Sequence, residues 1–302
     1  MGRSEYYRQM RELAGQTRAH YGLTTPRVLR SDMRRIYRDQ GIHIDLWPHR
    51  MKKVRGAYFD DDLGPTVMLV KGLPADPMVF TMAHEMGHSL HTILSHETQP
   101  FIYSSYTIFV AEVPSTLSEA LLLDYMLERS TDPVERIVLL QHAIDNITST
   151  FFTQVMFADF ELRAHRLAEE DKPITSEILT ELYSSLLKSY YGDAVDLNDL
   201  TGVTWARIPH FFNSPYYVYQ YATCFASAAK LARELTSGDE APQQAARQRY
   251  IELLRSGGSD HPMELLKRAG VDLTKPDTVR AIIEQLEDLV TRLEAELESV
   301  AT

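Results

Sequence analysis

The sequence predicts a mainly α-helical protein with a small α+β N-terminal part that carries a short sheet. Segments that alternate between apolar and polar residues, or that are rich in β-branched residues, occur within residues 41–70. Beyond residue 77, apolar residues recur at helical spacing almost to the end of the chain. Pro74 and Pro77 separate the two patterns. We therefore expect an N-terminal part at residues 1–76 and a helical domain at residues 77–302.

The N-terminal part is expected to contain two polar helices followed by three strands. A break at Pro26 separates the helices, and Gly41 ends the second one. An acidic turn joins the last two strands. The helices are predicted at residues 3–20 and 28–40, and the strands at residues 41–46, 55–60 and 66–70. A strand beside the next helix would offer its edge to an extended peptide. A sheet that only packs against that helix fits these residues equally well.

Helices account for nearly all of the remaining chain. Their predicted ranges are 79–91, 105–129, 133–168, 174–191, 215–235, 241–255, 260–269 and 276–299. The last of them is acidic and carries Leu and Val at heptad-like spacing. We expect it to cap its own domain, and pairing with a second chain is the alternative, so the sequence leaves the oligomeric state open.

The composition argues against several classes of protein. The net charge of −11 is unsuited to a nucleic-acid partner, because phosphate binding requires a basic face. Cys224 is the single cysteine, which excludes an internal disulfide and suits a reducing compartment. The N-terminus lacks the apolar region of a signal peptide, and no run approaches 18 apolar residues. We expect a cytoplasmic protein with neither nucleic acid nor membrane as partner.

The most informative motif is H-E-x-x-H, formed by His84, Glu85 and His88 within an apolar helical segment. Residues four apart lie on one face of a helix, so both imidazoles can bind one metal ion. Two histidine nitrogens suit zinc, and Glu85 can act as general base on a water. A chance match is the alternative. His91 lies on the same face one turn later, and we interpret it as a support for the ligands or a surface residue.

A third protein ligand must come from another segment, because the longer three-histidine motif is absent. The candidates are Glu97, Glu112, Glu119 and Asp124. Glu112 and Glu119 are seven residues apart on an apolar segment, where buried carboxylates require a partner. We expect Glu112 to bind the metal and Glu119 to support a ligand imidazole. Pro114 lies close to Glu112 and should either start or kink the helix.

A second group of polar residues lies in an aromatic segment at residues 207–221. It contains His210 and several tyrosines, including Tyr216, Tyr217 and Tyr219. Hydrolysis of an amide builds negative charge on the carbonyl oxygen, and phenol and imidazole groups are suitable donors to that oxygen. The alternative is an aromatic core with its hydroxyl groups at the surface.

Three segments together resemble oligoendopeptidase F, a thimet-type zinc oligopeptidase family: residues 84–91, residues 109–119 and residues 208–222. Residues 257–272 resemble it too. The resemblance covers roughly residues 77–299 and implies a zincin-like helical catalytic domain. It makes His84, His88 and Glu112 the ligands of one zinc ion and Glu85 the base. It makes His210 and Tyr219 the donors to the oxyanion, and it implies that Tyr216, Tyr217, Gly257 and Gly258 contact the substrate.

The N-terminal residues depart from that family, whose members are much longer. Residues 1–83 more weakly resemble small zinc peptidases that act as phage-immunity and radiation-response regulators. The sequence therefore predicts a zinc metalloendopeptidase that hydrolyses peptide bonds in oligopeptides. The alternatives are a regulatory protease that cuts one protein, such as a transcriptional repressor, and an inactive zinc-binding interaction module.

Overall fold

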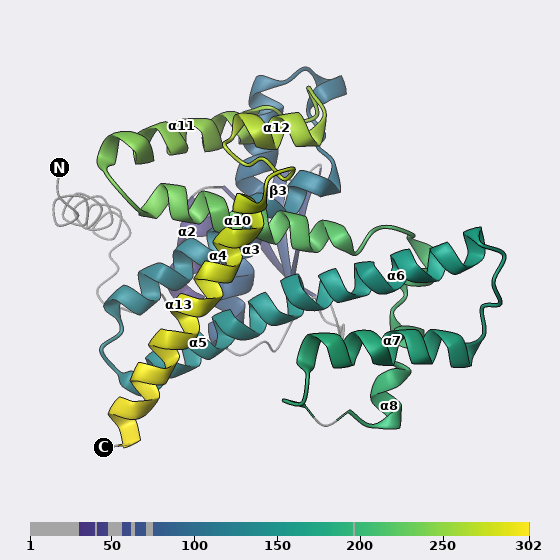
Figure 1. Cartoon of the computed structure of the whole chain (residues 1–302). Helices are drawn as coiled ribbons and strands as arrows, with labels where there is room; N and C mark the ends of the chain where they lie inside the picture. Colours follow the sequence, from purple (N-terminus) through teal and green to yellow (C-terminus); the bar gives the residue numbers. More distant parts are fainter. Residues whose placement is uncertain are drawn as a thin grey trace. The chain divides into compact units, whose positions relative to one another are not determined.

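The computed structural model describes residues 30–39, 41–47, 56–61, 64–70, 75–195 and 197–301. The helix predicted at residues 3–20 lies outside the described residues. The chain divides into two compact units, which are described separately below. Unit 1 comprises Met1–Ile144 and Cys224–Thr302, and unit 2 comprises Asp145–Thr223. Both are built mainly of helices (Figure 1), so the predicted fold class is confirmed.

Most of the regular structure belongs to unit 1. Its strands are β1 (His43–Trp47), β2 (Gly56–Asp61) and β3 (Gly64–Val70). Its helices are α2 (Arg30–Asp39), α3 (Ala75–Thr98), α4 (Ile108–Arg129), α11 (Glu240–Arg255), α12 (Pro262–Arg268) and α13 (Pro276–Ala301). Helices α5 (Pro133–Ile147) and α10 (Tyr219–Thr236) each cross from one unit to the other. None of the helices in the described part of the chain is long and apolar enough to cross a bilayer.

The three strands form one small sheet in the order β1-β3-β2. β1 pairs with β3 in parallel, with Ile44 opposite Val67, and β2 pairs with β3 in antiparallel. Val67 and Leu69 are buried on β3 and share a core with Met82 of α3. The sheet therefore gives the N-terminal half of α3 an apolar surface to pack against.

Helix α2 also anchors α3. Met33 and Tyr37 of α2 are buried in the same core as Met78 and Met82 of α3. The Tyr37 hydroxyl donates a hydrogen bond to the Met82 carbonyl. Burial, with a smaller effect from nearby Glu85, raises the pKa of Tyr37 far above its ordinary value, so the hydroxyl stays a donor. This contact fixes the turn of α3 that precedes the H-E-x-x-H motif.

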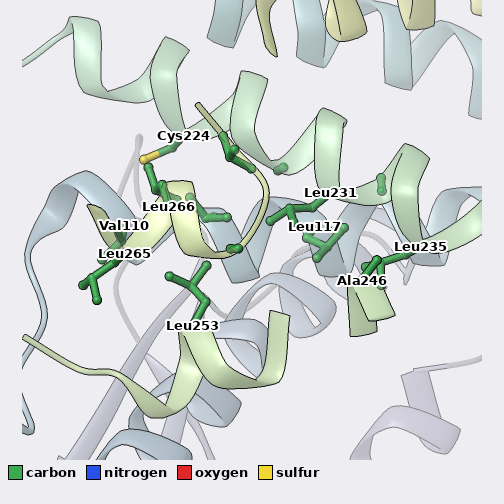
Figure 2. Close-up of a cluster of buried hydrophobic side chains, with 14 residues drawn as sticks. Val110, Leu117, Cys224, Leu231, Leu235, Ala246, Leu253, Leu265 and Leu266 are labelled. Atoms are coloured by element: carbon green, nitrogen blue, oxygen red, sulfur yellow. The ribbon is translucent and has the colours of Figure 1, made fainter. Parts of the chain in front are cut away.

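A second core packs α4 against the C-terminal helices. Figure 2 shows Val110 and Leu117 of α4 in one cluster with Leu231 of α10 and with side chains from α11 and α12. The Cys224 thiol lies 3.0 Å from the Phe109 carbonyl, and burial raises its pKa to about 12. Helix α13 buries Ile282 and Leu289. The cluster holds α4 in place, and α4 carries three of the candidate acidic residues, Glu112, Glu119 and Asp124.

Unit 2 has its own aromatic core. Its helices are α6 (Thr153–Glu169), α7 (Ser176–Tyr191), α8 (Asp199–Gly202) and α9 (His210–Asn213). A π-helical turn, Thr148–Phe152, interrupts the single helix predicted at residues 133–168. Phe157, Phe160 and Tyr183 pack together between α6 and α7. Their packing explains why this segment folds as a compact unit.

The prediction that a helix begins at Pro215 is wrong. The helix α10 begins at Tyr219, and Tyr216 has a backbone φ of 57°, which is a left-handed conformation rare for a tyrosine. The Tyr216 N–H donates to the buried Glu161 carboxylate at 2.8 Å. This hydrogen bond to a residue far away in the sequence stabilises the turn, so the helix begins four residues later than predicted.

Candidate metal centre

Helix α3 places two imidazoles on one face. His84 and His88 are four residues apart, and their Nε2 atoms are 3.2 Å apart. The rings meet edge to face with centroids 4.9 Å apart. Neither imidazole is fully buried, whereas Val79, Met82 and Ala83 on the preceding turns are. The apolar face thus fixes the rotation of the helix and directs both rings to one point.

A close approach of α3 and α4 brings a carboxylate to that point. A Cβ atom on Gly87 would lie 2.5 Å from the Pro114 carbonyl oxygen and 2.6 Å from the Ser115 Cα. Only glycine allows two helix backbones to come this close. Helix α4 starts six residues before Pro114, at Ile108, and runs through it, which excludes the alternative that the helix begins at Pro114.

Glu112 completes a triangle of ligand atoms. Its Oε2 atom lies 3.3 Å from Nε2 of His84 and 3.5 Å from Nε2 of His88. Ligand atoms of a tetrahedral zinc ion, with bonds of about 2.0–2.1 Å, are roughly 3.3 Å apart. The three observed separations agree with this spacing. His84, His88 and Glu112 are also the one set of described residues whose ligand atoms converge well enough to hold a metal ion.

Two polar side chains form hydrogen bonds that orient the candidate ligands. The Ser115 hydroxyl donates to Oε2 of Glu112 at 2.8 Å, and Ser115 is fully buried. Nδ1 of His84 lies 2.6 Å from Oε1 of Glu119. When Nδ1 carries the proton and donates to Glu119, Nε2 keeps its lone pair for a metal. Ser115 is not among the predicted site residues, although its position three residues after Glu112 on a helix is a usable signal.

The charges in the cluster are strongly coupled. Burial would lower the pKa of His84, but hydrogen bonds with Glu112 and Glu119 outweigh burial and raise this pKa to about 10. Burial would raise the pKa of Glu112, but the imidazoles of His84 and His88 lower it far below its ordinary value. The Glu112 carboxylate is therefore ionised at neutral pH. A cation bound here would compete with a proton for the His84 lone pair.

Glu85 lies beside this cluster and is only 4% exposed. Burial is the main cause of its raised pKa, and the nearby imidazoles reduce the effect. Its Oε2 atom is buried and has no hydrogen-bond partner among the described residues. An unpartnered buried carboxylate oxygen is costly unless it serves a bound ion, water or ligand. This oxygen and the ligand triangle both fit a metal centre that binds water.

His91 is fully buried, so its interpretation as a surface residue is wrong. Its ring stacks on Tyr106 with centroids 3.6 Å apart, and the Tyr106 hydroxyl lies 2.7 Å from the Thr92 hydroxyl. Burial, with a smaller contribution from His88, lowers the pKa of His91 to about 3, so the ring is neutral. The converging ligand set does not include His91.

The other two candidate ligands are not part of the converging set within the described residues. Glu97 is exposed near the end of α3. Asp124 lies further along α4, where burial raises its pKa to about 6. The charges that act on Asp124 come from Glu128 on its own helix and from Asp288 and Arg292 on α13.

Gly257 and Gly258 form a turn that packs against the segment following α3. The Gly258 N–H donates to the Tyr103 carbonyl at 2.8 Å. A Cβ on Gly257, whose φ is 49°, would lie 2.3 Å from the Tyr103 carbonyl oxygen and 2.5 Å from the Ser95 hydroxyl oxygen. Both positions therefore require glycine for close backbone packing, whatever further role the turn has.

The predicted histidine and tyrosines of the aromatic segment belong to unit 2. The His210 ring stacks on Tyr217 with centroids 5.3 Å apart and meets Tyr221 edge to face. Tyr216 packs against His165, with ring centroids 4.7 Å apart. Tyr219 begins α10 and is 39% exposed. The segment thus presents polar rings held by aromatic neighbours.

Comparisons with known proteins agree with this geometry. The profile of Peptidase family M3 matches residues 73–285, which include every residue discussed for the metal centre. The chain is 40% identical to Oligopeptidase PepF of Bacillus subtilis (strain 168) over 252 residues, which are 83% of this chain and 37% of that protein. It is also 40% identical to the Oligoendopeptidase F homolog of Lactococcus lactis subsp. lactis (strain IL1403), over 72% of this chain and 35% of that protein.

The solved structures give the same result. The crystal structure of oligoendopeptidase-F from Enterococcus faecium matches with a TM-score of 0.65 and 36% sequence identity. The match covers 74% of this chain and 40% of that one. The chain therefore spans well under half the length of the relatives to which it is similar.

Proposed function

The chain belongs to peptidase family M3, and from this premise we propose that it is a zinc metalloendopeptidase that hydrolyses peptide bonds in oligopeptides. The observation that supports this most strongly is the triangle of ligand atoms from His84, His88 and Glu112, with edges of 3.2, 3.3 and 3.5 Å. The names of the curated relatives, an oligopeptidase and an oligoendopeptidase F homolog, support oligopeptides as the substrate class.

In this proposal His84, His88 and Glu112 hold one zinc ion. When bound, zinc polarises the carbonyl of the scissile peptide bond and lowers the pKa of a water towards ~7. Glu119 keeps the His84 ring in the tautomer whose Nε2 is free, and Ser115 restrains the Glu112 carboxylate. A donor set of two imidazoles and one carboxylate, with the fourth position left to water, is typical of catalytic zinc sites.

Glu85 is the general base in this proposal. Its carboxylate removes a proton from the attacking water and then delivers that proton to the amine that leaves. The raised pKa of the buried carboxyl suits both steps, since a group that must accept and return a proton works best with a pKa near the working pH. The unpartnered Oε2 atom is available for the water.

The aromatic segment supplies the remaining roles. We assign His210 and Tyr219 as donors to the oxyanion that forms when water adds to the carbonyl. Tyr216, Tyr217 and the turn at residues 257–258 are assigned to substrate contact. We also retain the division into an N-terminal part at residues 1–76 and a catalytic domain at residues 77–302 as a proposal.

Metal analysis combined with digestion of a mixed peptide library tests this function. We expect about one zinc per chain and cleavage of peptides that a chelator abolishes and added zinc restores. Glu85→Gln should keep its zinc and lose about 10²–10⁴-fold in turnover, while Glu97→Gln, an exposed carboxylate on the same helix, should behave as wild type.

Other outcomes would contradict the proposal. A fully metallated chain that cleaves no peptide would identify an inactive zinc-binding module. Cleavage of one folded protein with no cleavage of short peptides would identify a regulatory protease. Wild-type turnover in Glu85→Gln would refute the role of the base.

A further inference from the structure

A groove of about 410 Å³ lies between helix α2 and strand β1, in the part of the chain that precedes the family match. Arg34 and Arg38 line it from the helix. His43, Ile44 and Leu46 line it from the strand. None of these residues belongs to the metal centre or to the aromatic segment, so the proposed peptidase mechanism leaves the groove unexplained.

The strand side of the groove is an edge of the described sheet. Among the strands that the structure describes, β1 pairs with β3 and with no other, because the sheet order is β1-β3-β2. In a parallel pair, alternate residues direct their backbone groups to opposite sides of the strand. The Leu46 N–H bonds to Oδ1 of Asp45 at 2.8 Å, which indicates that the backbone of Leu46, and that of Ile44 with it, faces away from β3. Such groups can pair with another extended chain.

The helix side of the groove carries unbalanced positive charge. Within the described part of the chain, the guanidinium groups of Arg34 and Arg38 form no ion pair and no hydrogen bond, and Nε of Arg34 is buried without a partner. Among the described residues of unit 1, most other arginines, such as Arg233 and Arg249, are paired with carboxylates. Unpaired guanidinium groups are unexpected in a chain with a net charge of −11. They favour a ligand with carboxylates.

The spacing of the two arginines matches that of an extended peptide. Residues four apart on a helix are about 6 Å apart along its axis. Side chains two apart on a strand point to the same face and are about 6.6 Å apart. Only three residues separate α2 from β1, so the strand returns alongside the helix. Acidic residues at alternate positions of a bound strand would therefore meet Arg34 and Arg38 in turn.

We propose that this groove binds an extended acidic segment of another protein. The segment adds to the free edge of β1 as a further strand, and its alternate carboxylates pair with Arg34 and Arg38. Its apolar residues contact Ile44 and Leu46, of which Leu46 is 37% exposed. Asp45 opposes the binding, because its carboxylate occupies the Leu46 N–H and repels the ligand.

Fluorescence anisotropy with labelled decapeptides tests the proposal. The probes are an alternating Glu-Val peptide, a Lys-Val peptide of the same pattern and a Glu-Pro peptide that lacks half of the backbone donors. The Glu85→Gln protein is used with chelator present, so neither peptide cleavage nor metal binding affects the measured anisotropy. We expect the Glu-Val peptide to bind and both other peptides to bind at least about tenfold more weakly.

Three variants test the roles of the two arginines and of Asp45 in peptide binding. Arg34→Gln with Arg38→Gln should weaken binding of the Glu-Val peptide about tenfold or more, whereas Asp45→Ala should strengthen it. Arg280→Gln, which removes an exposed charge on α13, is the matched control and should change nothing. When the same substitutions are made in the zinc-loaded protein with Glu85 intact, peptidase activity on short uncharged peptides should be unchanged, so a failed peptidase proposal and a failed groove proposal give different results.

Several results would overturn the proposal. These are equal binding of the Glu-Pro and Glu-Val peptides, unchanged affinity in the double arginine variant, or weaker binding by Asp45→Ala. If the double variant does not fold, as judged by circular dichroism, Asp45→Ala and the three peptides still decide the question.

Discussion

Nδ1 of His84 lies 2.6 Å from Oε1 of Glu119, and Nε2 of the same ring faces His88 and Glu112. One carboxylate from α4 therefore orients the imidazole, and a second carboxylate from the same helix joins it at the metal centre. The two acidic residues are seven apart, so one helix face supplies both. The packing of α3 against α4 is what converts a motif on one helix into a three-ligand site.

The first prediction concerns Glu119→Gln. Glutamine retains the length of the side chain but loses the charge that fixes the His84 tautomer. We expect zinc affinity to fall about 10–100-fold, as for other partners of metal-bound histidines. Competition titration against a fluorescent chelator measures this change. Glu97→Gln serves as the control, and wild-type affinity in Glu119→Gln would refute the role assigned to Glu119.

The second prediction concerns Gly87→Ala. Alanine favours a helix over glycine by about 1 kcal/mol, but its Cβ would meet the backbone of Pro114 and Ser115 at 2.5–2.6 Å. Backbone atoms cannot rotate away, so we expect a net loss of about 1–3 kcal/mol in the free energy of unfolding together with weaker zinc binding. Urea denaturation measures the first change.

Gly202→Ala is the matched control for that experiment. Its Cβ would meet the Ser184 hydroxyl oxygen at 2.6 Å, and this side chain can rotate to another position. The control should therefore retain its stability and its zinc affinity. A Gly87→Ala protein as stable as wild type would show that the two helices need not approach so closely.

The third prediction concerns pH and the metal-free protein. The pKa of His84 is about 10 in the folded state and about 6.5 in an unfolded chain. A group whose pKa is higher in the folded state stabilises the fold at pH values below its unfolded pKa. This stabilisation is lost as the pH rises through its folded pKa. The melting temperature of the chelated protein should therefore fall between pH about 6.5 and about 10.

Other groups titrate in this window, so the comparison with His84→Asn isolates the contribution of the imidazole. We expect the variant to show a smaller decrease in melting temperature. Zinc affinity of the wild type should rise over the same window, because zinc replaces the His84 proton. An identical pH dependence in both proteins would contradict the coupling between His84 and its two carboxylates.

The fourth prediction concerns Tyr219→Phe. Loss of one donor to an oxyanion typically lowers kcat about 10²–10³-fold, and zinc content should not change. Tyr217→Phe is the comparison variant: its ring can still stack on His210, and as a substrate contact Tyr217 should affect KM more than kcat. Steady-state kinetics with a quenched peptide measure both variants. An unchanged kcat in Tyr219→Phe, with a large decrease in Tyr217→Phe, would transfer the role to Tyr217.

The helical motif and the acidic pair could be inferred from the sequence because their geometry is local. His84 and His88 share a face on any α-helix, and so do Glu112 and Glu119. What the sequence cannot specify is that Gly87 meets Pro114, since this contact joins two helices.

The predictions that the structure contradicts fail because they depend on contacts between distant residues. Pro215 is a sound local signal for a helix start, but the distant Glu161 binds the Tyr216 N–H and holds a left-handed turn there. A surface position remained one of the two interpretations of His91, because the sequence does not reveal that Tyr106 stacks on its ring. Local rules therefore succeed within one element and fail where a remote side chain determines the conformation.

The most direct test of the metal centre is a crystal structure of the zinc-loaded protein with anomalous data at the zinc edge. We predict one peak at about 2.0–2.2 Å from Nε2 of His84, Nε2 of His88 and Oε2 of Glu112. A map without a peak at this point, or with zinc bound by other residues, would contradict the central claim that these three side chains form the metal site.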